Sequence, residues 1–557
     1  MARNVDLTFR RKNLHQLKLA TTSVRVRNKK DKVRTIMANK NIFGSVRGSL
    51  VPVTDTVNEA GGSAYSFTPE QSLAQMACMG TFNDTFYATG EAQVQTMLEL
   101  ATKVSPEFLA KLAVYSREEG FMKDSSALLL AVLHARNIDL FKKVFNRVID
   151  NGKMLRNFCQ IVRSGVTGRK SFGSAAKRLI GNWLNVRRDM QLFNDSVGNS
   201  PSLADVVKMA HPRPISPERD ALFAYLIGKP YDASKLPEEI RDYEAFKKVP
   251  AGSLRKVPRV NFQMLTALDL SKEEWKNLAM NMGWQATRMN LNTMARHGVF
   301  EDEKVVRAVA DRLRDPILIR NARAFPYQLL AAYTNVGEGV PMEIQLALQD
   351  AMEVATENVP RFSGKVVVAV DCSGSMSSPV TGHRKGATTT VMCNQVAALM
   401  AACILRTSED VTVIRFDTRA EKLRLNPRDS VMTNAERIGT DGGGTDCGSP
   451  VALLNKEGAR ANTVIVVSDN ESWFDDNRFV YGTTLANEWV KFKGRNQAAK
   501  LVCVDLAPNT TTQATSKKDV LNVGGMSDSV FDVIAAFLEN SGNPDFWVSK
   551  INKTVTL

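Results

Sequence analysis

The sequence has few of the residues that build covalent cross-links or transition-metal sites. Its 557 residues include seven cysteines, all scattered singly with no C-x-x-C pair, and only five isolated histidines. Closely spaced cysteines and histidines are the usual zinc ligands, so a zinc site is not expected. An odd number of separated cysteines in mostly apolar surroundings predicts buried free thiols in a reducing compartment. We therefore expect a cytoplasmic protein.

Long apolar runs and nucleotide-binding motifs are also missing. No stretch approaches the roughly 20 apolar residues of a membrane span, and no secretory signal pattern opens the chain. Neither G-x-x-x-x-G-K-[ST] nor a strand-linked G-x-G-x-x-G is present. These absences argue against a membrane partner and against nucleotide-dependent catalysis. The chain is too long for one core, so we expect two or three domains.

Acidic residues are absent from residues 151–188. This segment has a net charge of +9. Glycines at positions 165, 168 and 173 place several of the charges on a loop that leads into a helix over 174–186. A solvated basic face is one interpretation, but the complete lack of compensating acids favours binding of a polyanion such as nucleic acid. Its cations are Lys153, Arg156, Arg163, Arg169, Lys170, Lys177, Arg178, Arg187 and Arg188.

The first 48 residues form a second acid-poor segment. They contain 13 Lys or Arg and only Asp6 and Asp31, whereas residues 361–557 are nearly neutral. A basic arm of this kind binds polyanions or remains a solvated tail, and a transit peptide is also compatible with it. We treat residues 1–48 as a separate basic arm.

Helical periodicity dominates residues 69–358. Apolar residues recur at spacings of three and four in consecutive segments of ten to fifteen residues, separated by short breaks. This pattern predicts stacked antiparallel helix pairs, as in an α-solenoid of the HEAT or armadillo type. The stretch 228–258 is charged and contains prolines, so we expect a long loop or insertion there. Residues 49–68 are expected to be a polar connector.

After Pro360 the period changes to alternating strands and helices. Such alternation predicts an α/β domain over 361–557 with a doubly wound parallel sheet. The helical domain accordingly spans 49–360. The expected strands are Val366–Val370, Val411–Phe416, Thr463–Val467 and Lys500–Val504.

The pattern D-x-S-x-S directly follows the first expected strand, with Asp371, Ser373 and Ser375. Ligands in parallel sheets bind beyond the carboxyl ends of strands. One carboxylate and two hydroxyls suit a hard ion such as Mg²⁺ that keeps an open position. A Ser- and Gly-rich turn without metal is the alternative. No second carboxylate or histidine partner is evident in the adjacent sequence, so we expect no enzyme.

Two further loops complete this pattern. Thr445 lies in a Gly-rich loop, and Asp469 follows the strand 463–467. Together they resemble the metal-ion-dependent adhesion site of the von Willebrand factor A domain. The resemblance implies a divalent ion, expected to be Mg²⁺, whose coordination is completed by an acidic group of a partner. The metal ligands would be Asp371, Ser373, Ser375, Thr445 and Asp469.

The helical part shows a second resemblance. The stretches 60–87, 204–214, 286–300 and 320–333 are similar to the TROVE module, and TROVE followed by an A domain is the layout of the Ro ribonucleoprotein family. This implies a monomeric ring of HEAT-like repeats closed by the A domain. It also implies binding of small noncoding Y-like RNAs, and of the 3′ single-stranded ends of misfolded RNAs, in quality control, maturation or decay. An exoribonuclease docking through the A domain is an implied partner.

The resemblance and the basic segment together give the expected RNA contacts. His211, in KMAHPRP, falls where the family has an RNA-contacting histidine, although a helix C-terminal role fits it equally well. Phe193–Ser202 departs from the family in having no basic residue. A protein-docking module on a helical scaffold is the alternative function. The expected contacts are Arg169, Lys170, Lys177, Arg178, Arg187, Lys208, His211 and Arg213, with Arg288, His297 and Arg320 as cavity-side candidates that ion pairs would also explain.

Overall fold

The computed structural model describes residues 51–557 apart from 80–81, 198–200, 252, 254, 323, 325, 384–390, 440–441, 474–481, 508, 526–528 and 540–542. The predicted basic arm therefore lies outside the described residues. Val53–Leu557 form one compact unit. Among the helices described, none combines the length and apolar character that a membrane crossing requires.

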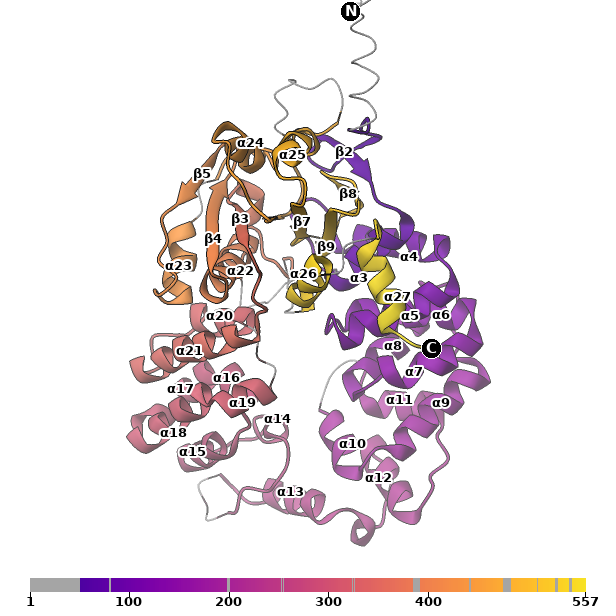
Figure 1. Ribbon diagram of the computed structural model, residues 1–557. Helices are drawn as coiled ribbons and strands as arrows, with labels where there is room; N and C mark the ends of the chain where they lie inside the picture. Colours follow the sequence, from indigo (N-terminus) through magenta and orange to yellow (C-terminus); the bar gives the residue numbers. More distant parts are fainter. Residues whose placement is uncertain are drawn as a thin grey trace, which may run out of the picture. The chain divides into compact units, whose positions relative to one another are not determined.

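The first part of this unit is helical, as predicted from periodicity (Figure 1). Local signals set many helix starts: the Ser105 side chain accepts a hydrogen bond from the Phe108 amide, with Pro106 at the first helical position. The helices up to the first long break are α3 (Pro69–Met79), α4 (Gly90–Lys103), α5 (Pro106–Glu118), α6 (Asp124–Arg136), α7 (Ile138–Val148), α8 (Gly152–Ser164), α9 (Gly173–Val186), α10 (Asp189–Asp195), α11 (Leu203–Ala210) and α12 (Pro217–Ile227).

The helical array continues to residue 355. Contacts link α5 with α6 and α7, α6 with α8, and α7 with α9, which is the pattern of stacked helix pairs. The remaining helices are α13 (Glu238–Lys248), α14 (Phe262–Leu265), α15 (Lys272–Asn281), α16 (Trp284–Met289), α17 (Leu291–Arg296), α18 (Glu303–Arg314), α19 (Pro316–Asn321), α20 (Pro326–Thr334) and α21 (Met342–Ala355).

The expected long loop at 228–258 is wrong in part, because it contains α13. This helix buries Ile240, Tyr243 and Phe246, which follow each other at three-residue spacing. Composition alone does not reveal this apolar face, because most of the residues between these three are charged. The array therefore continues through this stretch rather than being interrupted by an insertion.

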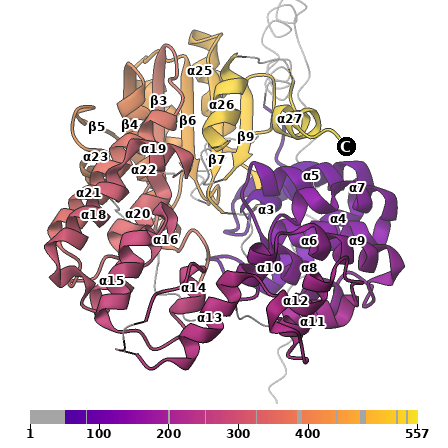
Figure 2. The ribbon, with the colours of Figure 1, turned by 90° about the horizontal axis from the view of Figure 1, so that it is seen from below.

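A six-stranded sheet forms the core of the C-terminal part, in the order β5-β4-β3-β6-β7-β9, which Figure 2 shows side by side. All four predicted strands are present, extended by a residue or two. The sheet is mixed rather than wholly parallel, because β5 pairs antiparallel with β4 at the edge. The strands are β3 (Lys365–Asp371), β4 (Asp410–Phe416), β5 (Ala420–Leu423), β6 (Thr463–Ser468), β7 (Lys500–Asp505) and β9 (Val520–Gly524).

Both faces of this sheet are covered, as doubly wound topology requires. Val366, Val368 and Val370 of β3 pack in one core, whereas Val367 and Ala369 pack in the other. The first core is continuous with that of the helical array. The helices are α22 (Cys393–Thr407), α23 (Val431–Ile438), α24 (Ser449–Lys456), α25 (Thr484–Arg495), α26 (Ser529–Glu539) and α27 (Phe546–Thr554).

The helical array contacts the α/β part through both its first and its last helices. At the start, α3 packs against β9, and α5 packs against α27. At the end, α20 contacts α22 and α21 contacts α23. This is the contact pattern that closure by an A domain requires. The segment expected to be a polar connector also contacts the α/β part. Its strand β1 (Thr56–Val57) pairs with β2 (Ser63–Ser66), and β2 pairs with β8 (Thr511–Thr512).

Candidate functional site

The five predicted metal ligands meet at the carboxyl edge of the sheet. Asp371 ends β3, and Asp469 directly follows its parallel neighbour β6. The loop that carries Thr445 reaches the same place, because the Gly374 amide donates to the Gly443 carbonyl at 3.1 Å. All five side chains are buried. Residues nearly 100 positions apart in the chain are thus brought together.

Hydrogen bonds fix the orientation of these groups. The Ser373 amide donates to Asp371 Oδ1 at 2.9 Å, and the hydroxyls of Ser373 and Ser375 lie 3.3 Å apart. The Ser468 hydroxyl donates to Asp371 Oδ2 and orients this carboxylate further. Sequence analysis missed Ser468, although its place at the end of β6, beside Asp469, is the signal that identifies it.

The two carboxylates destabilise one another. Burial and the neighbouring Asp469 charge raise the pKa of Asp371 to about 7. Burial also raises the pKa of Asp469, although the hydrogen bond with the Ser375 hydroxyl partly offsets this effect. Two desolvated carboxylates without a buried cation beside them are unfavourable unless a proton or a metal ion neutralises them. The donor set therefore fits a divalent ion.

A small cavity adjoins two of the five predicted ligands. A cavity of about 20 Å³ is lined by Ser375, Asp469 and Cys393 together with residues of the segment before α4. Within the described residues no three His, Cys, Asp or Glu side chains are grouped for metal binding. Hydroxyl oxygens would thus supply the rest of the coordination, which suits Mg²⁺ better than a transition metal.

A segment of the helical array covers this cavity. Thr85, Phe86 and Tyr87 line it from the side opposite the A domain. The segment is held to the A-domain loop after β3, because the His383 amide donates to the Asp84 carbonyl at 2.6 Å. Burial and the carboxylate of Asp469 raise the pKa of the Tyr87 phenol. Nothing local in the sequence predicts this contact, since almost 300 residues separate Tyr87 from Ser375.

A second group of predicted residues is exposed on α9, α11 and the loops beside them. It is here called the basic surface and comprises Lys170, Lys177, Arg178, Lys208, His211 and Arg213. Helices α9 and α11 pack side by side (Figure 1). Asn185 of α9 donates to the Arg213 carbonyl at 2.9 Å. All six side chains are exposed. None of the five Lys and Arg side chains forms an ion pair with another described residue. His211 closes α11 in the left-handed conformation, with φ 51°.

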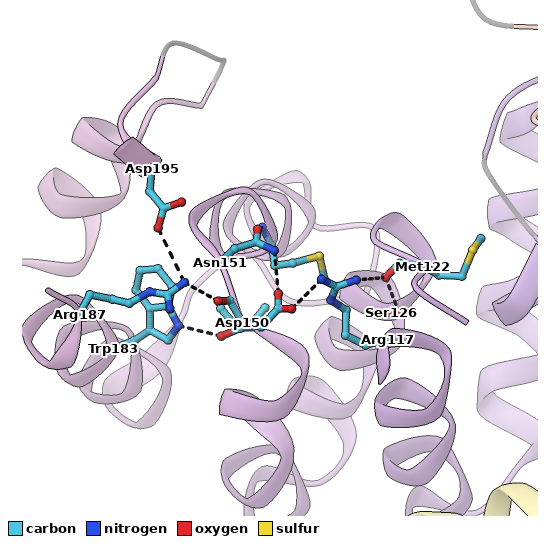
Figure 3. A network of polar contacts seen from close by, with 10 residues as sticks. Arg117, Met122, Ser126, Asp150, Asn151, Trp183, Arg187 and Asp195 are labelled. Atoms are coloured by element: carbon cyan, nitrogen blue, oxygen red, sulfur yellow. Dashed lines mark hydrogen bonds and ion pairs between the residues drawn. The ribbon is translucent and has the colours of Figure 1, made fainter. Parts of the chain in front are cut away.

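Arg169 and Arg187 differ from this surface because both are half-buried. Figure 3 shows the Arg187 guanidinium enclosed by Asp150, Trp183 and Asp195. It donates to the Asp150 carbonyl, lies 4.3 Å from the centre of the Trp183 ring and is 3.8 Å from Asp195. Arg187 therefore joins the start of α8 to the ends of α9 and α10, and we leave it out of the expected RNA contacts.

Replacing Arg187 by alanine is expected to lower the stability of the helical array without weakening RNA binding at moderate temperature. Loss of a charged hydrogen bond and a cation–π contact costs about 1–3 kcal/mol. Thermal unfolding and RNA titration at 20 °C separate the two effects. Loss of RNA affinity in a fully folded Arg187→Ala protein would instead assign the residue to the RNA interface.

The three cavity-side candidates are not brought together as one cationic cluster. Arg288 is largely buried and donates to the Gln328 carbonyl at 2.6 Å. His297 stacks on Trp275 with ring centres 4.1 Å apart. Arg320 is exposed and lies 3.5 Å from Glu357. The ion pair considered from sequence is thus present for Arg320, with Glu357, whereas Arg288 is held by a backbone carbonyl instead.

Comparisons with known proteins match both parts of the chain. The family model "Ro60 vWA domain" matches residues 365–538, and the model "TROVE domain" matches residues 202–429. The chain belongs to the Ro family. Its A-domain match begins at the first residue of β3 and includes all five predicted metal ligands. The TROVE match includes the Lys208, His211 and Arg213 part of the basic surface.

Relatives of this Ro-family chain cover most of its length. The "RNA-binding protein RO60" of Deinococcus radiodurans is 24% identical over an alignment of 547 positions, which covers 89% of this chain and 99% of the relative. The protein of the same name from Caenorhabditis elegans is 24% identical over 53% of this chain and 46% of its own. The crystal structure of Deinococcus radiodurans RO (RSR) has a TM-score of 0.60, with 22% identity, over 85% of this chain and all of that one.

Proposed function

We propose that this Ro-family protein is a non-enzymatic RNA-binding protein of the cytoplasm that acts in quality control, maturation or decay of RNA. It binds small noncoding Y-like RNA and structured RNAs with a 3′ single-stranded tail. The basic surface carries this proposal, because its five Lys and Arg side chains are exposed on two segments whose helices pack together, and none forms an ion pair within the described residues. Such a face binds phosphates, and loop and helix-end residues add backbone donors. Two relatives named as RNA-binding proteins support it.

The test is a titration of labelled RNA hairpins, with and without a 3′ single-stranded tail, at several salt concentrations. We expect the tailed hairpin to bind more tightly than the blunt one, with a steep decrease in affinity as salt rises. Equal affinity for both hairpins, or binding that is insensitive to salt, would contradict the proposal.

The metal site supports a second, compatible function, which is docking of a protein partner such as an exoribonuclease. Asp371, Ser373, Ser375, Thr445 and Asp469 would hold Mg²⁺, which would supply a Lewis-acidic position for a carboxylate of the partner. Because the segment with Tyr87 covers the cavity, this segment has to move before a large partner can reach the ion. A Mg²⁺-dependent pull-down of the partner that is lost in Asp371→Asn tests this function.

A further inference from the structure

A large groove lies between the segment after α13 and the helices α15 and α16, in the part of the array where Figure 1 labels α13–α16. Its volume is about 1510 Å³. Pockets for small molecules measure roughly 300–1,000 Å³, so this groove is large enough for a short length of extended polymer. It lies outside the basic surface and the metal site.

One wall of the groove carries exposed, mostly amide side chains at four-residue spacing: Asn277, Asn281, Gln285 and Met289. Asn277 and Asn281 lie on the same side of α15, and α16 adds Gln285 and Met289 to the same groove. The Asn281 side chain donates to the Asn277 carbonyl at 2.8 Å, and Gln285 makes only a 3.9 Å contact with the Met289 sulfur. The Asn281 amide nitrogen also lies 3.3 Å from Asn277 Oδ1. The Asn277 amide nitrogen and the amide oxygens of Asn281 and Gln285 form no hydrogen bond within the described part of the chain and line the groove.

The opposite wall is positively charged. Lys256 and Arg259 line it, are exposed, and form no ion pair with any other residue described. The two acidic residues of the lining are already neutralised, because Glu273 pairs with Lys276 at 2.9 Å and Glu274 pairs with Arg255 at 2.5 Å. The unpaired charge of the groove is thus positive and confined to one wall.

Arg255 fixes the two walls relative to one another. Its guanidinium is buried, bonds both oxygens of Glu274 on α15, and donates to the carbonyls of Val249 and Asp269 at 2.6 and 2.7 Å. It also lies 4.0 Å from the centre of the Phe246 ring. Because these contacts lie within the protein itself, they hold the groove in shape, and a preformed groove lowers the entropy cost of association.

We propose that this groove binds single-stranded RNA and distinguishes its bases. Lys256 and Arg259 would contact phosphates, while the amides, which both donate and accept, would pair with base edges. Those edges are available only in unpaired nucleotides. An extended peptide also bonds to amides, but the unpaired cations favour a polyanion. The inference rests on the proposed RNA-binding function and adds base selectivity to it at a separate site.

The test measures binding of the full-length protein to fluorescein-labelled single-stranded decamers A10, C10 and U10. We expect affinities that differ by about fivefold or more, since one good amide–base pair discriminates by about 1 kcal/mol or more. In Asn281→Ala/Gln285→Ala the three affinities converge, whereas the control Gln95→Ala/Asn552→Ala, with exposed amides elsewhere, keeps the difference. In Lys256→Ala/Arg259→Ala all three weaken together, and the salt slope falls by about 1.4, because each phosphate contact on a single strand contributes about 0.7.

Several results would overturn the inference while leaving the proposed function intact. One is that the wild-type protein binds tailed hairpins but does not distinguish the decamers. Others are an unchanged difference in Asn281→Ala/Gln285→Ala, or photo-crosslinks from 4-thiouridine decamers that map outside residues 255–290. Tighter binding of a glutamate decapeptide than of any RNA decamer, lost in the same variant, would identify a peptide groove. Failure to bind hairpins, by contrast, contradicts the proposed function itself.

Discussion

Replacing Lys170, Lys177 and Arg178 together by alanine is expected to weaken binding of tailed hairpin RNA by roughly 150-fold near 0.15 M salt. The three side chains are exposed and unpaired within the described residues, so their removal leaves no buried charge and little loss of stability. Taking about 1 kcal/mol for each exposed phosphate contact gives about 3 kcal/mol, which corresponds to this factor. The loss should be similar for all sequences, because phosphate contacts carry no base information.

The salt dependence separates this effect from misfolding. Each phosphate contact on a duplex contributes about 0.9 to the slope of log K against log salt, so the slope should fall by about 2.7. The control is Lys103→Ala/Lys143→Ala/Lys304→Ala, which removes the same charge from exposed positions on α4, α7 and α18. An equal loss in the control would show that overall charge, rather than the basic surface, determines binding.

The sequence predicts where the proposed metal ligands Asp371 and Asp469 lie, because both stand at the ends of recognisable strands. Val366–Val370 is short, β-branched and apolar on both faces, so Asp371 has to lie at a strand end, and parallel strands align such ends. The same reasoning places Asp469. This reasoning does not predict which residues of the helical part contact the site, because Tyr87 comes close to Ser375 only through packing of the helical array on the A domain.

The exposure of the proposed RNA contacts is predicted less completely, for a related reason. A count of charges identifies an acid-poor segment but not which cations face solvent. Arg187 and Lys177 look alike in sequence. In the structure, however, the Arg187 guanidinium contacts the carbonyl of Asp150 and the ring of Trp183, whereas Lys177 is exposed. The adjacency of α9 and α11 also depends on long-range packing, which local periodicity does not specify. The sequence does not predict the groove beside α15, because one of its walls follows α13 in a stretch expected to be a loop.

The second large effect concerns the metal site. Mg²⁺ is expected to raise the thermal unfolding temperature of the wild-type protein at pH 7.5 by several degrees, because a ligand at 100 times its Kd stabilises the folded state by about 2.7 kcal/mol. Asp371→Asn should abolish this increase. The control Asp410→Asn, an exposed acid at the opposite end of the neighbouring strand β4, should retain it. A full Mg²⁺ effect in Asp371→Asn would place the ion elsewhere.

The metal-free protein should show the opposite order of stability. The folded-state pKa of Asp371 is about 7, well above that of an unfolded Asp, about 3.9. Between these values the folded state binds more protons, so stability falls as pH rises from about 4 to 7. Asp371→Asn removes the desolvated charge beside Asp469, so in EDTA at pH 7.5 it should be more stable than wild type and less dependent on pH. Differential scanning calorimetry from pH 5 to 8, with EDTA and with Mg²⁺, should thus show the two proteins exchanging order. A capped turn that binds no metal would give no such exchange, because Mg²⁺ would then leave the stability of both proteins unchanged.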